Sequence, residues 1–288
     1  IIYMLHPLIM GVTGTLETLS NSEKKVIRDD YKVTKNTYVP SVFGKNNLRF
    51  IEKDDIIIEN NNDYFNQIKR EVDDRIIGRN LEKRAILVFF ESQAKLMSFY
   101  ESSALESIKE SVVYLTEDTL LEEKEVIISR ATVSDQITLF MRTFGRGTDF
   151  KCHDQTVATN GGTHVIQTFL LEKFSEEKQI KGRTAGQGDQ GSYSMILHEQ
   201  DLEKFHIDQT HIGHILKGKS FIARDINIIA DTIHLSKTYH TLYDLLDDKR
   251  TELFKVQYEE NKKYVEQAKR VRFLVESSED EKYYSYIV

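Results

Sequence analysis

Blocks of apolar and polar residues alternate along the middle of the chain. Uninterrupted apolar runs predict buried strands at residues 84–90, 112–115, 125–129, 137–141, 164–168 and 193–197. The segments between these runs predict helices at residues 64–76, 92–101, 117–125 and 172–181, the first of them from the helical spacing of Tyr64, Ile68, Val72 and Ile76. Strands that alternate with helices in this way predict an α/β fold, in which a parallel sheet carries helices on both faces.

The two ends of the chain follow other patterns. An apolar segment broken at Pro7 precedes a polar connector, in which Tyr38-Val39-Pro40 is expected to be extended. Beyond Glu199 a long helix is predicted, and we expect it to pack across the preceding domain through an apolar face made by Phe254, Tyr258, Val265, Ala268 and Val275. We therefore divide the chain into residues 1–50, 51–200 and 201–288.

Composition and charge narrow the class of protein. Hydrophobic residues make up 40% and charged residues 30% of the 288 residues, which is enough apolar material for a real core. The formal net charge of -7 gives no support to a nucleic-acid partner. Cys152 is the single cysteine, so no internal disulfide forms and a reducing compartment is favoured. No apolar run approaches the roughly 20 residues of a membrane span, and a first residue other than Met suggests a fragment of a longer protein.

Candidate chemistry gathers in two glycine-rich stretches. Residues 182–192 read GRTAGQGDQGS, and residues 143–149 read TFGRGTD directly after a predicted strand. Glycine lets a backbone approach a ligand closely, and an arginine fork suits phosphate oxygens. Because ligands of open α/β sheets bind at the carboxyl ends of the strands, we expect the site at that edge.

The order of these motifs resembles a known family. Residues 145–149 (GRGTD), residues 161–168 (GGTHVIQT) and residues 179–192, which fit the pattern Q-x-x-G-R-x-x-x-Q-G-D-x-G-S, resemble the second motor domain of SecA. SecA is an ATP-driven preprotein translocase of helicase superfamily two. Residues 11–15 (GVTGT) resemble the segment that ends the first motor domain of that family. The resemblance covers roughly residues 1–200 and implies a RecA-like sheet followed by a helical scaffold-like region.

The resemblance also assigns roles to individual residues. It implies that ATP with Mg binds between this half and a first motor domain that the chain lacks, and that Arg183 is catalytic through contact with the terminal phosphates. The implied nucleotide-binding residues are Gly145, Arg146, Gly147, Asp149, Gln179, Arg183 and Asp189, and the implied coupling residues are Thr13, Gly14 and Thr15. No metal ligand of the protein itself is implied. Two structural alternatives stay open: Arg183 pairs with Asp189, or either aspartate caps a following helix.

One position departs from the family pattern. Gly186 stands where the family carries its second arginine, usually taken as the arginine finger. Three accounts are open: a slow motor, a cation supplied from elsewhere such as Lys181, or a degenerate ATPase kept as a switch. The chain also lacks a G-x-x-x-x-G-K-[ST] phosphate loop. We therefore expect negligible ATP hydrolysis by the chain alone.

These features lead to one principal hypothesis and two rivals. The principal one is the C-terminal motor half of a SecA-like translocase, whose partners are a first motor domain, a polypeptide substrate and, as the family allows, a membrane translocation channel. Such a protein is cytoplasmic or peripheral at a membrane. The first rival is a nucleotide-gated interaction scaffold, which Gly186 favours. The second is half of an RNA or DNA helicase. The sequence GGTHVIQT and the net negative charge both argue against this rival. His206, His211 and His214 fit no structural zinc spacing.

Overall fold

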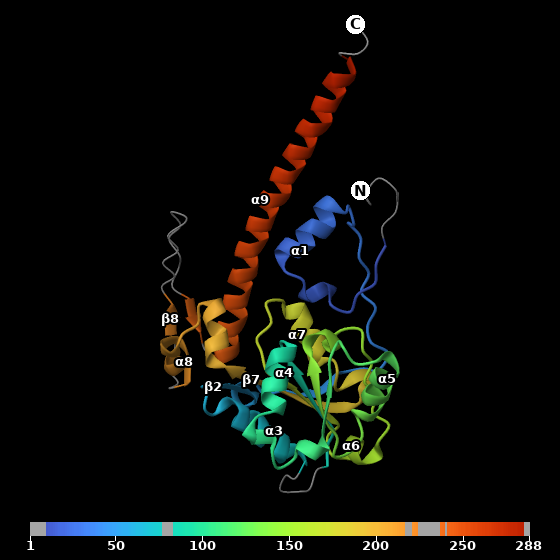
Figure 1. Ribbon diagram of the computed structural model, residues 1–288, viewed down its shortest axis with the longest axis vertical. Helices are drawn as coiled ribbons and strands as arrows, with labels where there is room; N and C mark the ends of the chain where they lie inside the picture. The colour runs from blue at the N-terminus through green and yellow to red at the C-terminus, as the bar shows by residue number, and fades with distance from the viewer. Residues whose placement is uncertain (1–9, 77–82, 217–220, 224–236, 240, 285–288) are drawn as a thin grey trace.

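The computed structural model describes residues 10–76, 83–216, 221–223, 237–239 and 241–284. Within them, seven parallel strands form one sheet in the order β1-β7-β6-β3-β5-β4, and β2 joins the same side of β7 as β1 (Figure 1). The strands are β1 (Asn47–Arg49), β2 (Ile56–Glu59), β3 (Ile86–Phe90), β4 (Val112–Leu115), β5 (Ile137–Met141), β6 (Thr163–Gln167) and β7 (Gln190–His198). The predicted parallel α/β sheet is confirmed.

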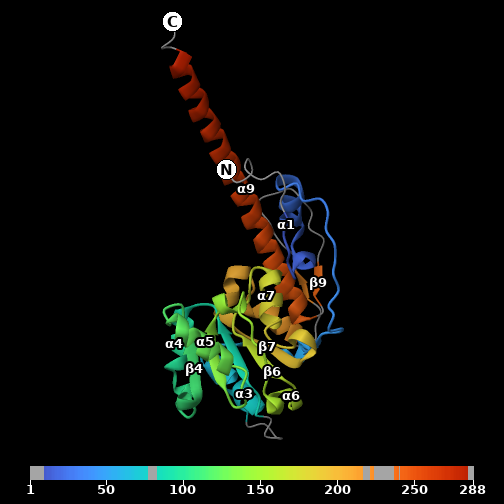
Figure 2. The ribbon, with the colours of Figure 1, turned by 90° about the vertical axis from the view of Figure 1, so that its right-hand side faces the viewer.

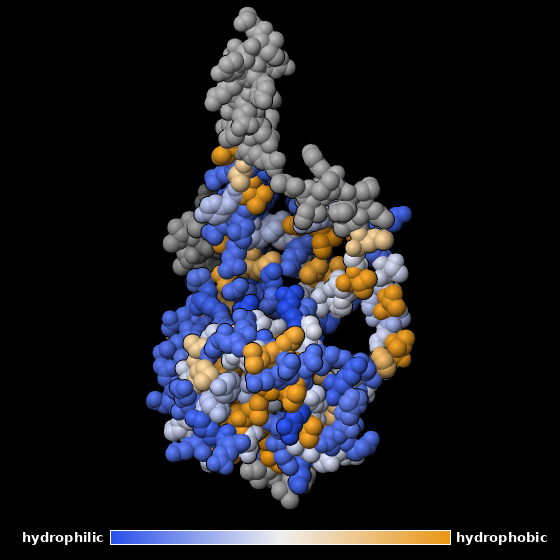
Figure 3. Space-filling model, turned by 45° about the vertical axis from the view of Figure 1, so that its right-hand side comes forward, coloured by the Kyte–Doolittle hydropathy of each residue, from blue (hydrophilic) through white to orange (hydrophobic). Residues whose placement is uncertain are grey.

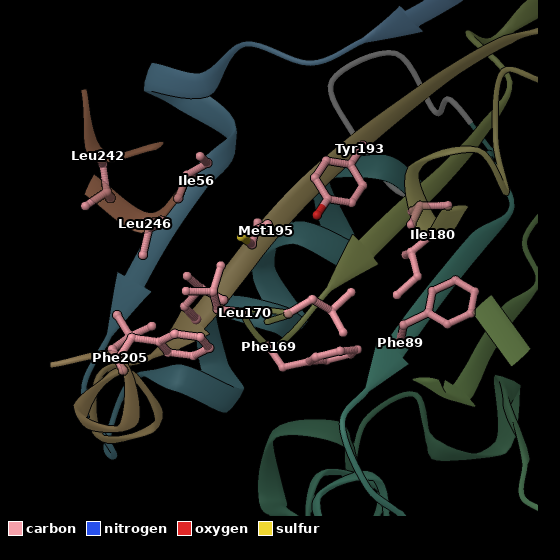
Figure 4. Packing of buried hydrophobic residues seen from close by; sticks show 14 of the residues in the cluster. Ile56, Phe89, Phe169, Leu170, Ile180, Tyr193, Met195, Phe205, Leu242 and Leu246 are labelled. Carbon is pink, nitrogen blue, oxygen red and sulfur yellow. The ribbon is translucent and has the colours of Figure 1, made fainter. Parts of the chain in front are cut away.

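Helices cover both faces of this sheet because each central strand is apolar on both sides. Ile86, Val88 and Phe90 of β3 pack with α3 (Tyr64–Ile76) and α4 (Gln93–Tyr100). Leu87 and Phe89 point to the opposite face, which α5 (Leu121–Arg130), α7 (Phe174–Lys181) and the first turns of α9 (Leu242–Tyr284) cover (Figure 2). On that face Ile180 lies beside Phe89, and Leu246 lies near Ile56, while Tyr193 and Met195 of β7 lie between these two groups (Figure 4).

The strand predicted at residues 125–129 is wrong, because these residues belong to α5. Ile127 and Ile128 are partly buried against the core, whereas Val126 is 54% exposed, so the three residues point in different directions as a helix requires. A short apolar run fits a strand and a buried helix equally well by periodicity alone. The other five predicted strands are present as β3, β4, β5, β6 and β7.

The connector before β1 is extended, apart from one short turn of 3-10 helix (η2, Leu16–Thr18) and the helical turns of α1 (Asn21–Lys25) and η3 (Val26–Asp30). Several of its apolar side chains face solvent, among them Tyr38, Val39, Val42 and Phe43. Figure 3 shows apolar residues along this extended segment, beside the hydrophilic surface of the sheet domain. Residues 1–9, and with them the predicted break at Pro7, lie outside the described residues.

The region after β7 is only partly helical. The helices η8 (Glu199–Phe205) and α8 (Gln209–Leu216) are followed by an antiparallel pair, β8 (Phe221–Ala223) and β9 (Lys237–Tyr239), and then by α9. Leu245 and Leu246 of α9 are buried, but residues 259–271 are all exposed and the helix projects away from the sheet (Figures 1 and 2). The long helix is thus confirmed, and Phe254 and Tyr258 are half-buried. The expected packing of Val265 and Ala268 across the sheet domain is wrong, and the side chain of Val275 lies outside the described residues. The division at residues 50 and 200 stays a prediction.

None of the helices in the described ranges combines the length and the apolar character of a membrane-spanning helix.

Candidate functional site

The loop between α7 and β7 borders a cavity of about 260 Å³. Its walls come from residues 149–153, which follow β5, from the first residues of β6 and β7, and from the loop itself: Asp149, Phe150, Lys151, Cys152, His153, Thr163, Gly182, Arg183, Thr184, Ala185, Gly186, Gln187, Asp189 and Gln190. Because Thr163 opens β6 and Gln190 opens β7, the cavity lies at the amino ends of these strands. The stretch at residues 143–149 follows the carboxyl end of β5 as expected, whereas the glycine-rich loop at residues 182–189 lies before β7, because α7 brings the chain back across the sheet before this loop begins.

The loop has a constrained backbone. Ala185 and Gln187 both adopt left-handed conformations, with φ of 54° and 56°, although neither is glycine. Such conformations cost free energy and tend to gather at functional sites. Gly162 lies so close to the loop's end that a Cβ there would fall 1.7 Å from the Gln190 carbonyl oxygen. The loop is therefore closely packed where it enters β7, and it is less tightly packed where it faces the cavity.

Arg183 is half-buried at the edge of the cavity. Its Nε donates to the Gln179 carbonyl at 2.9 Å, and a second guanidinium nitrogen donates to the Thr148 carbonyl. No carboxylate of the described residues forms an ion pair with it, so the alternative of a pair with Asp189 is not observed. Burial lowers the pKa of its guanidinium, while the charge of Asp149 opposes this shift, and arginine stays cationic in either case. The fork thus keeps donors for an anionic ligand.

The two aspartates of the motifs also line the cavity. Asp149 Oδ2 lies 3.3 Å from Lys151 Nζ, and both side chains are more than half exposed. Neither aspartate caps a following helix: Asp154 is the N-cap of α6 (Gln155–Thr159), and Asp189 is followed by β7. The capping alternative is therefore wrong for both residues, and their carboxylates are available to solvent or ligand.

Arg146 and Gln179 meet each other, away from the cavity walls. Arg146 Nε donates to Gln179 Oε1 at 2.9 Å, and a second nitrogen donates to Glu176 Oε1 at 3.2 Å. Gly145 allows this approach, because a Cβ there would fall 2.6 Å from Ile180 Cγ1 of α7. Gly147, the next glycine of the motif, has a left-handed φ of 69°. This part of the motif joins the chain after β5 to α7, and nucleotide contact by these residues stays a prediction.

Lys181 is not placed to supply a cation to the cavity. Its Nζ lies 2.7 Å from Glu177 Oε1, and its side chain is 13% exposed. The ammonium also lies 4.1–4.9 Å from the ring centroids of Phe50, Tyr193 and Tyr243. In this conformation Lys181 therefore does not replace the arginine that Gly186 lacks.

Sequence reasoning missed Lys151 and His153, which line the cavity. Both side chains are exposed. The sequence feature that could have identified them is their position just after Asp149, in the segment that lies beside the loop between α7 and β7. The coupling residues Thr13, Gly14 and Thr15 form a bend, in which the Thr15 N–H donates to Thr13 Oγ1 at 3.1 Å. They are not among the residues that form the cavity walls, so their coupling role stays a prediction.

A buried polar network supports the cavity from behind. Ser192 Oγ lies 2.7 Å from His164 Nδ1 and accepts from Arg84, which also donates to the carbonyls of Gly161 and Gly162. His164 Nε2 lies 3.0 Å from Glu71 Oε1. Burial lowers the pKa of His164 to about 4, against the hydrogen bond and charge of Glu71. The imidazole is thus neutral near pH 7 and ties α3 to the starts of β6 and β7.

Metal binding by the protein itself finds no support in the described part of the chain. No group of three or more His, Cys, Asp and Glu side chains there could hold an ion. His211 Nδ1 pairs with Asp208 Oδ1 at 2.7 Å, and the side chain of His214 lies outside the described residues.

Comparison with known sequences gives a consistent family likeness. No protein-family model matches the chain. The chain is 26% identical over 200 residues to the protein translocase subunit SecA of Campylobacter fetus, covering 69% of this chain and 21% of that protein. It is 26% identical over 273 residues to the protein translocase subunit SecA 2 of Bacillus thuringiensis, covering 88% and 32%. The chain thus spans about a fifth to a third of the length of these relatives.

Comparison with solved structures returns helicase domains at low similarity. Domain 2 of the DEAD-box helicase Mss116p, bound to an RNA duplex, gives a TM-score of 0.40 at 16% identity, covering 50% of this chain and 53% of that one. The C-terminal part of the Fun30 ATPase domain gives 0.37 at 14% identity, covering 65% and 53%. The resemblance expected from the motifs is confirmed by the sequence relatives: the chain is SecA-like.

Proposed function

We propose that this SecA-like chain is the C-terminal motor half of an ATP-dependent protein translocase. ATP with Mg would bind between the cavity and a first motor domain, and closure of the two halves would move a polypeptide substrate. The observation that carries the proposal is Arg183, a half-buried guanidinium at the cavity that is hydrogen-bonded to two carbonyls and forms no ion pair with a described carboxylate. A cation held in this way suits a polyanion such as a triphosphate.

The cavity walls fit the phosphate end of a nucleotide. Arg183 and Lys151 supply positive charge, and Asp149 and Asp189 supply carboxylates that could hold Mg-bound water. ATP would supply the phosphoanhydride bond, and Arg183 would stabilise negative charge on the phosphate oxygens. Gly145, Arg146, Gly147 and Gln179 would act behind this site, by holding the chain after β5 against α7. Thr13, Gly14 and Thr15 would transmit nucleotide state between the two halves.

A second candidate function is a nucleotide-gated scaffold with little hydrolysis. Two observations favour it: Gly186 carries no side chain, and Lys181 is held by Glu177 and three aromatic rings. Within this proposal nucleotide would still bind and close the two halves, but turnover would be slow. A nucleic-acid helicase half ranks behind both, because the net charge is -7 and the sequence relatives are protein translocase subunits.

The proposed cellular location and partners follow from the similarity to SecA. We place the protein in the cytoplasm or peripherally at a membrane, with a first motor domain, a polypeptide and a membrane translocation channel as partners.

The test is ATP binding and turnover by the parent protein, which includes the first motor half. We expect Arg183→Ala to lower turnover about 10³-fold, as loss of a phosphate-contacting arginine does, whereas Arg28→Ala, at an exposed pair with Asp29, should not. Equal turnover by the parent and Arg183→Ala would contradict the proposal. ATP binding without turnover, with turnover gained by Gly186→Arg, would establish the scaffold instead. The 288-residue chain alone should hydrolyse almost no ATP.

A further inference from the structure

An ion pair with two almost completely buried side chains joins α7 to α9. The side chain of Glu177 on α7 is 0% exposed, that of Arg250 on α9 is 1% exposed, and their charged groups are hydrogen-bonded. Burial opposes ionisation of Glu177, but the charges of Arg250 and Lys181 outweigh it and lower the pKa of its carboxyl. A buried charge that loses its partner is strongly unfavourable, so the pair keeps the two helices in one relative position.

Other contacts concentrate at the same junction. Tyr243 of α9 donates its hydroxyl to Glu177 Oε1 at 2.6 Å, and Lys181 Nζ lies 2.7 Å from the same oxygen. The Lys181 ammonium then rests among the rings of Phe50, Tyr193 and Tyr243, an arrangement that cation–π attraction favours. Phe50, which follows β1, therefore meets α7, β7 and α9 at one cluster of charges and rings.

The last turn of α7 sets the position of Arg183. Gly182 ends the helix, and the backbone N–H of Arg183 donates to the Ile180 carbonyl at 2.9 Å. The side chain also donates to the Gln179 carbonyl of that turn. By contrast, Gly182 and residues 186–189 are exposed. The guanidinium is thus placed by α7 far more than by the loop that follows it.

The other side of the junction is a projecting helix. Among the side chains of α9 that the structure describes, the buried ones lie in its first turns, and residues 259–271 are exposed on a helix that leaves the body of the protein (Figures 1 and 2). A force on the projecting part would act on the packed first turns, where Arg250 holds Glu177. A displacement of α9 would therefore reach α7 through this pair.

We propose that Arg250 is a positioning residue for Arg183: through Glu177 it fixes α7, and thereby the guanidinium at the nucleotide cavity, in register with α9. The inference rests on the proposed function for its consequence in catalysis, but its structural part concerns this chain alone. On this proposal the orientation of α9 controls the position of Arg183, the arginine proposed to contact phosphate. The residues of the junction do not themselves line the cavity.

Hydrogen exchange of the 288-residue chain tests the structural part. The variant Arg250→Met keeps an apolar stem of similar length. The double variant Glu177→Gln with Arg250→Met removes both charges of the pair and leaves the Lys181 ammonium among its three aromatic rings. We expect amide exchange of residues 182–189 to rise about tenfold or more in both, with little change in β3 and β5. Arg250→Lys, which restores the charge, should recover most of the protection.

The matched control is Glu252→Gln, which removes an ion pair with Lys249 within α9 and does not touch α7. It should leave exchange of residues 182–189 unaltered. Unchanged exchange of these residues in the folded double variant would overturn the proposal. So would an equal rise in β3 and β5, since the pair would then support the fold in general and not Arg183.

Turnover by the parent protein tests the catalytic part. The same variants should lower kcat, and Arg250→Lys should restore it in step with the exchange protection. If the parent neither binds nor hydrolyses ATP while exchange of residues 182–189 responds as expected, the proposed function fails and the positioning role of Arg250 stands. If Arg183→Ala abolishes turnover but the double variant changes neither exchange nor kcat, the positioning role fails and the proposed function stands.

Discussion

Gly191, the second residue of β7, lies directly against Thr184 of the loop between α7 and β7. A Cβ at Gly191 would fall 1.9 Å from Thr184 Oγ1, which itself donates to the Thr163 carbonyl at 2.5 Å. The loop that carries Arg183 is thus folded back onto the first residues of β6 and β7. In contrast, Gly186 of the same loop has no heavy atom within 4 Å of its would-be Cβ. Gly191 therefore allows close packing between the loop and β7, whereas Gly186 faces open space.

Alanine substitutions at Gly191 and Gly186 should differ in their effect on the free energy of unfolding. We expect Gly191→Ala to lower the free energy of unfolding by roughly 2 kcal/mol or more, because a methyl group would displace Thr184. Gly186→Ala should change it by less than about 0.5 kcal/mol, since it faces open space. Urea unfolding of both variants measures the difference. Equal losses would show that the loop does not rest on β7 in solution.

The buried imidazole of His164 should make stability depend on pH. Its pKa is about 4 in the folded chain against the usual 6.5, so the unfolded state binds more protons between these values and stability falls as the pH drops through this window. From pH 7 to pH 5 the expected loss is about 2 kcal/mol. Urea unfolding of His164→Gln should lack this loss. His153→Gln, at an exposed histidine of the cavity, should retain it; a retained slope in His164→Gln would contradict the assignment.

Two buried tyrosines should respond oppositely to removal of the hydroxyl. The Tyr193 hydroxyl has no hydrogen-bond partner among the described residues, whereas the Tyr64 hydroxyl donates to the Thr168 carbonyl at 2.7 Å. Tyr193→Phe should therefore raise the unfolding free energy by about 1 kcal/mol, and Tyr64→Phe should lower it by a similar amount. Thermal or urea unfolding checks both signs. A loss in Tyr193→Phe equal to that in Tyr64→Phe would mean that its hydroxyl is satisfied.

The local pattern predicted most of the sheet, because strands buried on both faces read as continuous apolar runs. It failed at residues 125–129, where only contact with the core distinguishes a helix from a strand: Ile127 and Ile128 touch it and Val126 does not. It also failed for the far part of α9, since an apolar face predicts a partner without saying whether this chain supplies it.

By itself the sequence determined the α/β class, the SecA likeness and the identity of the motif residues, since all of these depend on residue types at fixed spacings. The tertiary structure decided what each residue does within the fold. It placed Lys151 and His153 on the cavity, joined Arg146 to Gln179, and held Lys181 away among Glu177 and aromatic rings. It also set the cavity at the amino ends of β6 and β7. The physical reason is that hydrogen bonds and burial connect residues that are far apart in the chain, such as Glu177 and Arg250, and no local pattern encodes those distances.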